Sequence, residues 1–340
     1  MVSPTSQQAK ITISLFVILS STVSTFAEEC NYGESGGGIC HNTKKALKLK
    51  ITAIGSILLS SMVGVCLPLL THKFGAFHPD KNLFTVVKAF ASGVILATGY
   101  MHVLPDAFEC LHSPCLPENP WRRFPFTTFV AMLSAVLTLM VDSLAMSYNK
   151  KCKKIGENGE KMENDIQKVE EGETEKGSQA LLRHRVVAQV LEAGIVVHSV
   201  VIGLSMGTSD NACTIRPLIA ALCFHQLFEG MGLGGCILQA QYGMKMKGIM
   251  VMFFSGTTPL GIGLGMGLSK TYKPNSPTAL IVVGILNASS AGLLNYMALV
   301  DLLAAEFLGP KLQQNIKLQF KSYLAVLLGA GGMSLMAIWA

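Results

Sequence analysis

The sequence predicts an all-α, polytopic membrane protein with eight transmembrane helices. Half of its 340 residues are hydrophobic and only 14% are charged, a composition typical of membrane proteins. Eight nearly uncharged stretches approach the ~20 residues that a helix needs to cross a bilayer. Helices are expected because backbone groups in lipid must find their hydrogen bonds inside the segment. The predicted spans are 51–71, 85–104, 126–148, 186–208, 217–238, 248–268, 278–300 and 322–340.

The first 27 residues are typical of a secretory signal peptide. Lys10 precedes the apolar run 11–19, and small residues follow up to Ala27. The alternative is a ninth helix, but the run is short for a span and Ser/Thr-rich at its end. We therefore expect cleavage after 1–27, leaving 28–50 as an extracytoplasmic N-terminal segment.

Cleavage fixes the predicted orientation of the spans. Both termini would be extracellular, with spans 1–3 in 51–148 and spans 4–8 in 186–340. The predicted cytosolic loops carry most of the Lys and Arg residues, as the positive-inside rule requires. The basic cluster at 44–50 argues against this orientation, but the signal peptide and the other loops outweigh it. The signal peptide indicates the plasma membrane. The positive net charge is explained by membrane topology, and we predict no nucleic-acid partner from it.

The one long hydrophilic insert, 149–185, is predicted to be a disordered cytosolic loop. It begins with lysines, becomes rich in glutamate and contains four glycines. Such a composition is typical of a solvated linker.

Five cysteines would face the oxidising side of the membrane. Cys30–Cys40 and Cys110–Cys115 are candidate disulfides, and Cys213 is the fifth, although sequence alone does not fix connectivity.

Small residues recur every four positions on the fourth, fifth and sixth spans. Gly203 and Gly207, Gly230 and Gly234, and the glycines of 261–267 form these stripes. Small-xxx-small stripes let helices approach closely in lipid. The three spans are therefore predicted to form one tight bundle.

Three ionisable residues lie in the middle of the fourth and fifth spans. The link between these spans is short, so the helices should be antiparallel neighbours. Counted from that link, His198 lies as far back as His225 and Glu229 lie forward, at ~1.5 Å per residue. His225 and Glu229 are four apart and share a helix face, which Gln226 borders. Ionisable groups at mid-bilayer need a partner, and imidazole with carboxylate suits a divalent metal. The alternative is a buried His–Glu hydrogen bond that fixes packing.

Further polar residues predict a path through the membrane. His102, Asp106 and Glu109 at the outer end of the second span would collect cations at an entrance, unless they are ordinary surface charges. Asp142 and Glu192 would form an exit site in the inner third. A structural pair with Lys88 is the alternative for these two acids.

At these residues the chain strongly resembles the ZIP (Zrt-, Irt-like) family of divalent metal transporters, above all its plant branch with the root iron-regulated transporters. The resemblance covers roughly 45–340, and its most specific motifs are in the fourth and fifth spans. The matching segments are Met101–Glu109, Glu192–Gly207, Leu222–Gly235 and Asp301–Lys311.

The resemblance implies a three-two-three inverted repeat of spans, with metal between the fourth and fifth. It also implies that His198, Ser199, His225 and Glu229 match positions needed for transport, and that Asp106, Glu109 and Asp142 match positions linked to transport or selectivity. Gln226 and Ile202 fall where bacterial relatives carry acidic ligands, which favours a single-metal site.

We therefore predict a carrier that imports a divalent metal, most simply Zn²⁺, into the cytosol by alternating access. Uptake of Fe²⁺, or of Fe²⁺, Mn²⁺ and Zn²⁺ together, is the alternative, and a channel is a further one. No cofactor is expected, because the metal is the substrate. An intramembrane metallohydrolase is disfavoured, because His225–Glu229 lacks the second histidine of a zincin helix. The sequence leaves the oligomeric state open, with a homodimer as one alternative.

Overall fold

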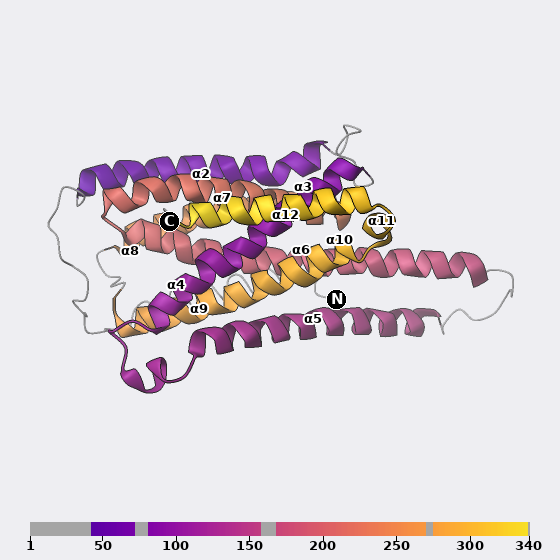
Figure 1. The fold of residues 1–340 in the computed structure, drawn as a ribbon, viewed down its shortest axis with the longest axis horizontal. Coiled ribbons are helices and arrows are strands. Elements are labelled where there is room, and N and C mark those ends of the chain that lie inside the picture. The colour runs from indigo at the N-terminus through magenta and orange to yellow at the C-terminus, as the bar shows by residue number, and fades with distance from the viewer. Residues whose placement is uncertain (1–41, 72–80, 158–167, 270–274, 339–340) are drawn as a thin grey trace.

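The computed structural model describes residues 42–71, 81–157, 168–269 and 275–338, and every regular element in these ranges is helical. Figure 1 shows an elongated bundle of long helices. The elements are α2 (Thr43–Thr71), α3 (Asn82–Thr98), the π-helix η1 (Gly99–Val103), α4 (Leu104–Leu111), the π-helix η2 (Glu118–Arg122), α5 (Phe126–Glu157), α6 (Lys168–Thr208), α7 (Ala212–Gln239), α8 (Met244–Leu268), α9 (Pro277–Tyr296), the π-helix η3 (Met297–Ala304), α10 (Ala305–Phe307), α11 (Pro310–Gln313) and α12 (Ile316–Met336).

The all-α membrane fold predicted from the sequence is confirmed. Among the described helices, seven are long and apolar enough to cross a membrane. Each coincides with one of the first seven predicted spans. The eighth predicted span corresponds to α12, a helix of 21 residues that lies along α3.

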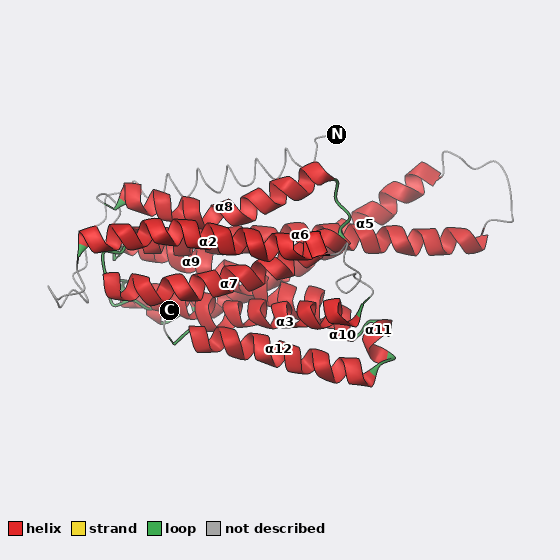
Figure 2. Cartoon of the chain, turned by 90° about the horizontal axis from the view of Figure 1, so that it is seen from above, coloured by secondary structure: helices red, strands yellow, loops and turns green. Residues whose placement is uncertain are grey.

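The helices pack in two groups. The helix α2 lies against α7 and α8, and α6 lies against α8. In the second group, α3 pairs with α12 and α9 pairs with α5 and α4. Viewed from above, α8 and α12 form opposite edges of the bundle (Figure 2). The site described below lies where α6 and α7 meet the continuous helix formed by α3, η1 and α4.

Glycines set the closest helix contacts. A Cβ atom added to Gly203 on α6 would lie 2.6 Å from the Thr258 carbonyl oxygen and 3.0 Å from the Gly261 Cα on α8. The predicted close packing of the fourth and sixth spans is therefore found. The stripe on the fifth span has another partner, because Gly230 packs against Val65 of α2. The first span thus completes the bundle that the sequence assigned to spans four to six.

The long hydrophilic insert differs from its prediction at both ends. The helix α5 continues to Glu157, and α6 begins at Lys168, so only 158–167 falls outside the described residues. Figure 1 shows α5 and α6 extending beyond the bundle at this end. Both ends of 149–185 are therefore helical in the structure, whereas the sequence predicted disorder. Lys, Glu, Gln and Ala are good helix formers, which explains why the polar ends continue the two helices.

The cysteines also correct the sequence analysis. Cys115 and Cys213 are both disulfide-bonded, whereas Cys110 is a free thiol. The predicted Cys110–Cys115 disulfide is therefore wrong. Cys110 belongs to α4, inside the second span, and spacing along the chain could not reveal this. The predicted Cys30–Cys40 pair and the signal peptide at 1–27 lie outside the described residues.

A short link holds α6 and α7 antiparallel. The Asn211 side chain caps α7 by accepting hydrogen bonds from the backbone N–H groups of Cys213 (3.0 Å) and Thr214 (3.4 Å). Beside it, Lys50 of α2 pairs with Asp210 at 3.3 Å. This end is thereby fixed, and the middle of α6 faces the middle of α7.

Candidate metal site

The two histidines and the glutamate predicted at mid-membrane lie together in the structure. The ring centroids of His198 on α6 and His225 on α7 are 5.3 Å apart. His225 Nε2 lies 3.2 Å from Glu229 Oε2, one turn further along α7. All three residues are at most 1% exposed. The depth predicted by counting residues along the two spans is therefore reproduced.

A third histidine joins this group, and the sequence analysis did not place it there. The ring centroid of His102 is 6.2 Å from that of His225. His102 belongs to the π-helix η1, an element that often marks functional positions in a helix. Its predicted place at an outer entrance is therefore corrected, because it lies beside the central site.

These side chains are buried without the hydrogen bonds that buried polar groups normally make. Both ring nitrogens of His198, Nε2 of His102 and of His225, and both carboxylate oxygens of Glu229 lack a hydrogen-bond partner. The short contact between His225 and Glu229 does not have hydrogen-bond geometry. A bound cation would take one nitrogen from each imidazole and an oxygen of Glu229, and the second nitrogen of His198 would still need another partner.

The spacing of the rings suits a shared ion. Two imidazoles bound to one tetrahedral ion at ~2.0–2.1 Å would have centroids roughly 5 Å apart. The His198–His225 distance of 5.3 Å fits this geometry. Within the described ranges, no three His, Cys, Asp or Glu side chains already converge on one point that could hold an ion.

Gln226 has a different environment from the three ionisable residues. Its amide nitrogen donates to Ser199 Oγ (3.2 Å) and Thr258 Oγ1 (3.1 Å), and its carbonyl oxygen accepts from Ser61 Oγ (3.2 Å). These partners lie on α6, α8 and α2. Gln226 and Ser199 thus form a satisfied polar network beside the site and connect four helices.

The predicted entrance residues Asp106 and Glu109 lie on α4, on exposed positions of the helix. In the described part of the chain, no ion pair neutralises either carboxylate.

The two predicted exit residues have different neighbours. Asp142 on α5 has a buried oxygen without a partner and interacts with Asp301 and Tyr296. Glu192 on α6 is 7% exposed, and its electrostatic neighbour is Tyr242. The alternative pairing with Lys88 is wrong, because Lys88 donates to Glu306 (2.6 Å) and Gln239 (3.0 Å).

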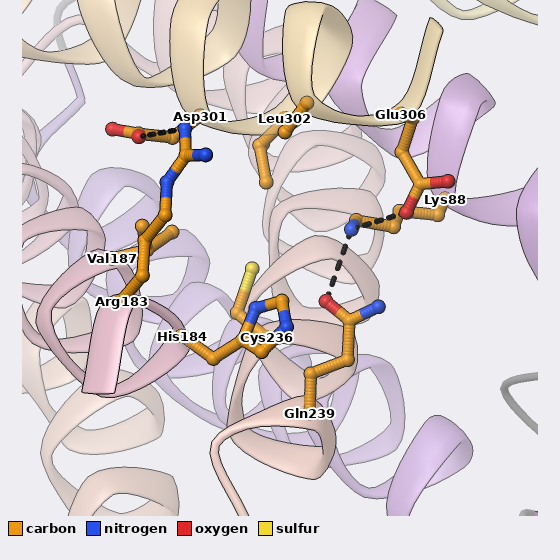
Figure 3. Close-up of a pocket in the computed structure, with 10 residues that line it drawn as sticks. Lys88, Arg183, His184, Val187, Cys236, Gln239, Asp301, Leu302 and Glu306 are labelled. Atoms are coloured by element: carbon orange, nitrogen blue, oxygen red, sulfur yellow. Dashed lines mark hydrogen bonds and ion pairs between the residues drawn. The ribbon is translucent and has the colours of Figure 1, made fainter. Parts of the chain in front are cut away.

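A cluster of charges near the end of α7 was missed by the sequence analysis. Figure 3 shows Lys88 with Glu306, and Arg183 with Asp301, at the walls of a cavity. Asp301 and Glu306 come from η3 and α10, which the sequence placed beyond the seventh span. The extra turns of this span bring them into the bundle.

Comparison with known proteins decides the family. The family described as "ZIP Zinc transporter" matches residues 47–337. This chain belongs to the ZIP family. As a ZIP protein it is a multi-pass membrane transporter of metal ions and not an enzyme.

Individual ZIP proteins align over nearly the whole chain. The Fe(2+) transport protein 1 of Oryza sativa subsp. japonica is 60% identical over 325 residues, 89% of this chain and 87% of the rice protein. Zinc transporter 7 of Arabidopsis thaliana is 55% identical over 358 residues, 97% of this chain and 98% of that protein. Fe(2+) transport protein 1 of Arabidopsis thaliana is 56% identical over 328 residues, 95% of this chain and 94% of that protein.

Proposed function

We propose that this protein carries Zn²⁺ into the cytosol and that the ion binds between α6 and α7. The observation that supports this most directly is the group of buried, unpartnered donors of His198, His225 and Glu229. Leaving such groups unsatisfied in a membrane is costly, and a divalent cation compensates for it. Relatives named as zinc transporters support the choice of ion.

The chemistry of the donors defines the binding step. Imidazole binds a metal only when neutral, and Glu229 supplies negative charge against the divalent ion. His102 would complete the set from η1. We place Asp106 and Glu109 at the entrance, and Asp142 on the route of release. Transport by alternating access would expose this central site to one side at a time.

The disulfides support the proposed orientation. Cys115 follows α4, and Cys213 lies in the first turn of α7, beside the link from α6. Disulfides persist on the oxidising side of a membrane, so we assign this end to the extracellular face. The ends of α5 and α6 that approach 158–167 would then be cytosolic. We further propose the plasma membrane as the location and 1–27 as the cleaved leader.

Fe²⁺ is the second candidate substrate. Imidazole and carboxylate ligands bind both Zn²⁺ and Fe²⁺, so the donor set alone fits either ion. Relatives named Fe(2+) transport proteins reach 60% identity. The ratio of uptake rates for the two ions decides between them.

The test is uptake of radiolabelled Zn²⁺ and Fe²⁺ in cells that express wild type, His198→Ala or Glu229→Gln at equal surface levels. Uptake should vanish in both variants, because each removes a donor from the centre. His112→Ala is the matched control, since His112 is exposed after α4. Undiminished uptake by the His198 and Glu229 variants would contradict the central site.

A further inference from the structure

The end of the bundle opposite the disulfides contains a polar cavity of about 90 Å³. Its lining includes Lys88, Arg183, His184, Cys236, Asp301 and Glu306. Figure 3 shows the two cations on opposite walls, each directed toward an acidic side chain. Four charged groups around one small cavity must neutralise one another or bind an ion.

Two interactions across this cavity join separate helix groups. Arg183 of α6 contacts Asp301 of η3 at 3.4 Å, and Lys88 of α3 donates to Gln239 of α7 at 3.0 Å. The helices α6 and α7 carry the central site, whereas α3 and η3 belong to the other group. Lys88 also holds Glu306 at 2.6 Å inside that second group. The Asp301 side chain is 1% exposed, so its charge depends on Arg183 for compensation.

The two acids of the cavity follow a Tyr-Met pair, as the entrance acids do, although the spacing differs. Tyr100-Met101 is followed by Asp106 and Glu109, and Tyr296-Met297 is followed by Asp301 and Glu306. A π-helix lies in each of these segments, η1 and η3. The two segments run in opposite directions, so their acids lie at opposite ends of the bundle (Figure 1). Of these four acids, Asp301 and Glu306 (the inner acids) form ion pairs in the described residues, whereas Asp106 and Glu109 form none.

We propose that Arg183 and Lys88 form an inner gate. In the closed state Arg183 neutralises Asp301 and Lys88 neutralises Glu306. The Arg183–Asp301 and Lys88–Gln239 contacts hold α6 and α7 against η3 and α3. Opening separates these groups and breaks the Arg183–Asp301 and Lys88–Gln239 contacts. Asp301 is then free to receive the metal ion as it leaves the central site. The assignment of this gate to the inner side rests on the proposed function. Opening and closing of the gate can be measured without transport.

Cys236 provides the readout. It is a free thiol on α7, lines the cavity and is 3% exposed. In the closed state a membrane-impermeant maleimide added to inside-out vesicles should label it slowly. The variant Arg183→Gln/Asp301→Asn removes both charges of the pair, so no buried charge is left uncompensated. Labelling of Cys236, followed by peptide mass spectrometry without metal, should become roughly fivefold faster, the factor expected for a partly exposed ion pair.

Two further variants separate gating from damage to the fold. The charge swap Arg183→Asp/Asp301→Arg should restore slow labelling, because the attraction is rebuilt. Lys50→Gln/Asp210→Asn is the matched control, since it removes an ion pair of similar length (3.3 Å) and burial at the other end. That control should leave the labelling rate of Cys236 unchanged.

The outcomes are distinct for the two proposals. Equal labelling of wild type and Arg183→Gln/Asp301→Asn would overturn the gate, and so would equal acceleration by the Lys50/Asp210 control. Neither result bears on the central site. Conversely, unchanged uptake by His198→Ala would overturn the proposed metal site while leaving the labelling result intact.

Discussion

Replacing Gln226 by alanine tests whether this residue supports the site or binds the metal. The substitution removes three hydrogen bonds, to Ser199, Thr258 and Ser61, from a side chain that is 0% exposed. Hydrogen bonds between membrane helices contribute about 0.6 kcal/mol on average, and those in soluble proteins about 1 kcal/mol. The three bonds together with the small cavity left behind correspond to roughly 2–4 kcal/mol.

The assay is thermal unfolding of the purified protein in detergent, without metal. We expect the midpoint of Gln226→Ala to fall by roughly 4–16 °C, at the ~2–4 °C for each kcal/mol that is typical of proteins of about 150–250 residues. Gln313→Ala is the control, because this side chain donates one hydrogen bond, to the Phe307 carbonyl (2.7 Å), at an exposed position. Its midpoint should change by about 2 °C or less.

The same measurement with Zn²⁺ separates support from binding. Zn²⁺ that binds only the folded protein raises the stability of the folded state. A variant that keeps the metal-binding residues should keep this increase. Gln226→Ala should retain the Zn²⁺-dependent rise in midpoint, whereas His198→Ala should lose it. An unchanged midpoint in Gln226→Ala without metal, or loss of the Zn²⁺ effect there, would refute the reasoning.

The remaining predictions concern pH, packing and cysteines. Acidification of the medium should raise the KM for Zn²⁺, since protons compete with the metal for the histidines, and a KM that stays constant down to the lowest pH at which the protein remains folded would contradict this. Gly203→Leu should prevent recovery of monodisperse protein, because a Cβ there already lies 2.6 Å from the Thr258 carbonyl oxygen, whereas Gly263→Leu should be tolerated in open space. Cys110→Ser should leave thermal stability within about 0.5 kcal/mol, and Cys115→Ser should cost about 2–4 kcal/mol, both measured without reductant.

Apolar length and residue counting predicted the positions of the spans and the depth of the central group. They worked because α6 and α7 are uninterrupted near a short link, so distance along the chain converts directly into height. The partners of charged side chains were harder to predict. Lys88 pairs with Glu306, a residue 218 positions away, and no local pattern encodes such a pair. The disulfide of Cys115 likewise depends on how loops meet in space.

The misplacement of His102 has a specific physical cause. Pro105, Asp106 and Glu109 indicated a polar helix end, so the second span was predicted to stop at 104. The structure instead continues through η1 and α4 to Leu111, with Pro105 in the first turn of α4, directly after the π-helix. His102 then lies nine residues before the end of the span, or ~14 Å at 1.5 Å per residue. That is about half of a ~30 Å hydrocarbon core, and the His102 ring lies 6.2 Å from that of His225 on α7. His102 therefore lies beside the central site, although its sequence context indicated an exposed helix end.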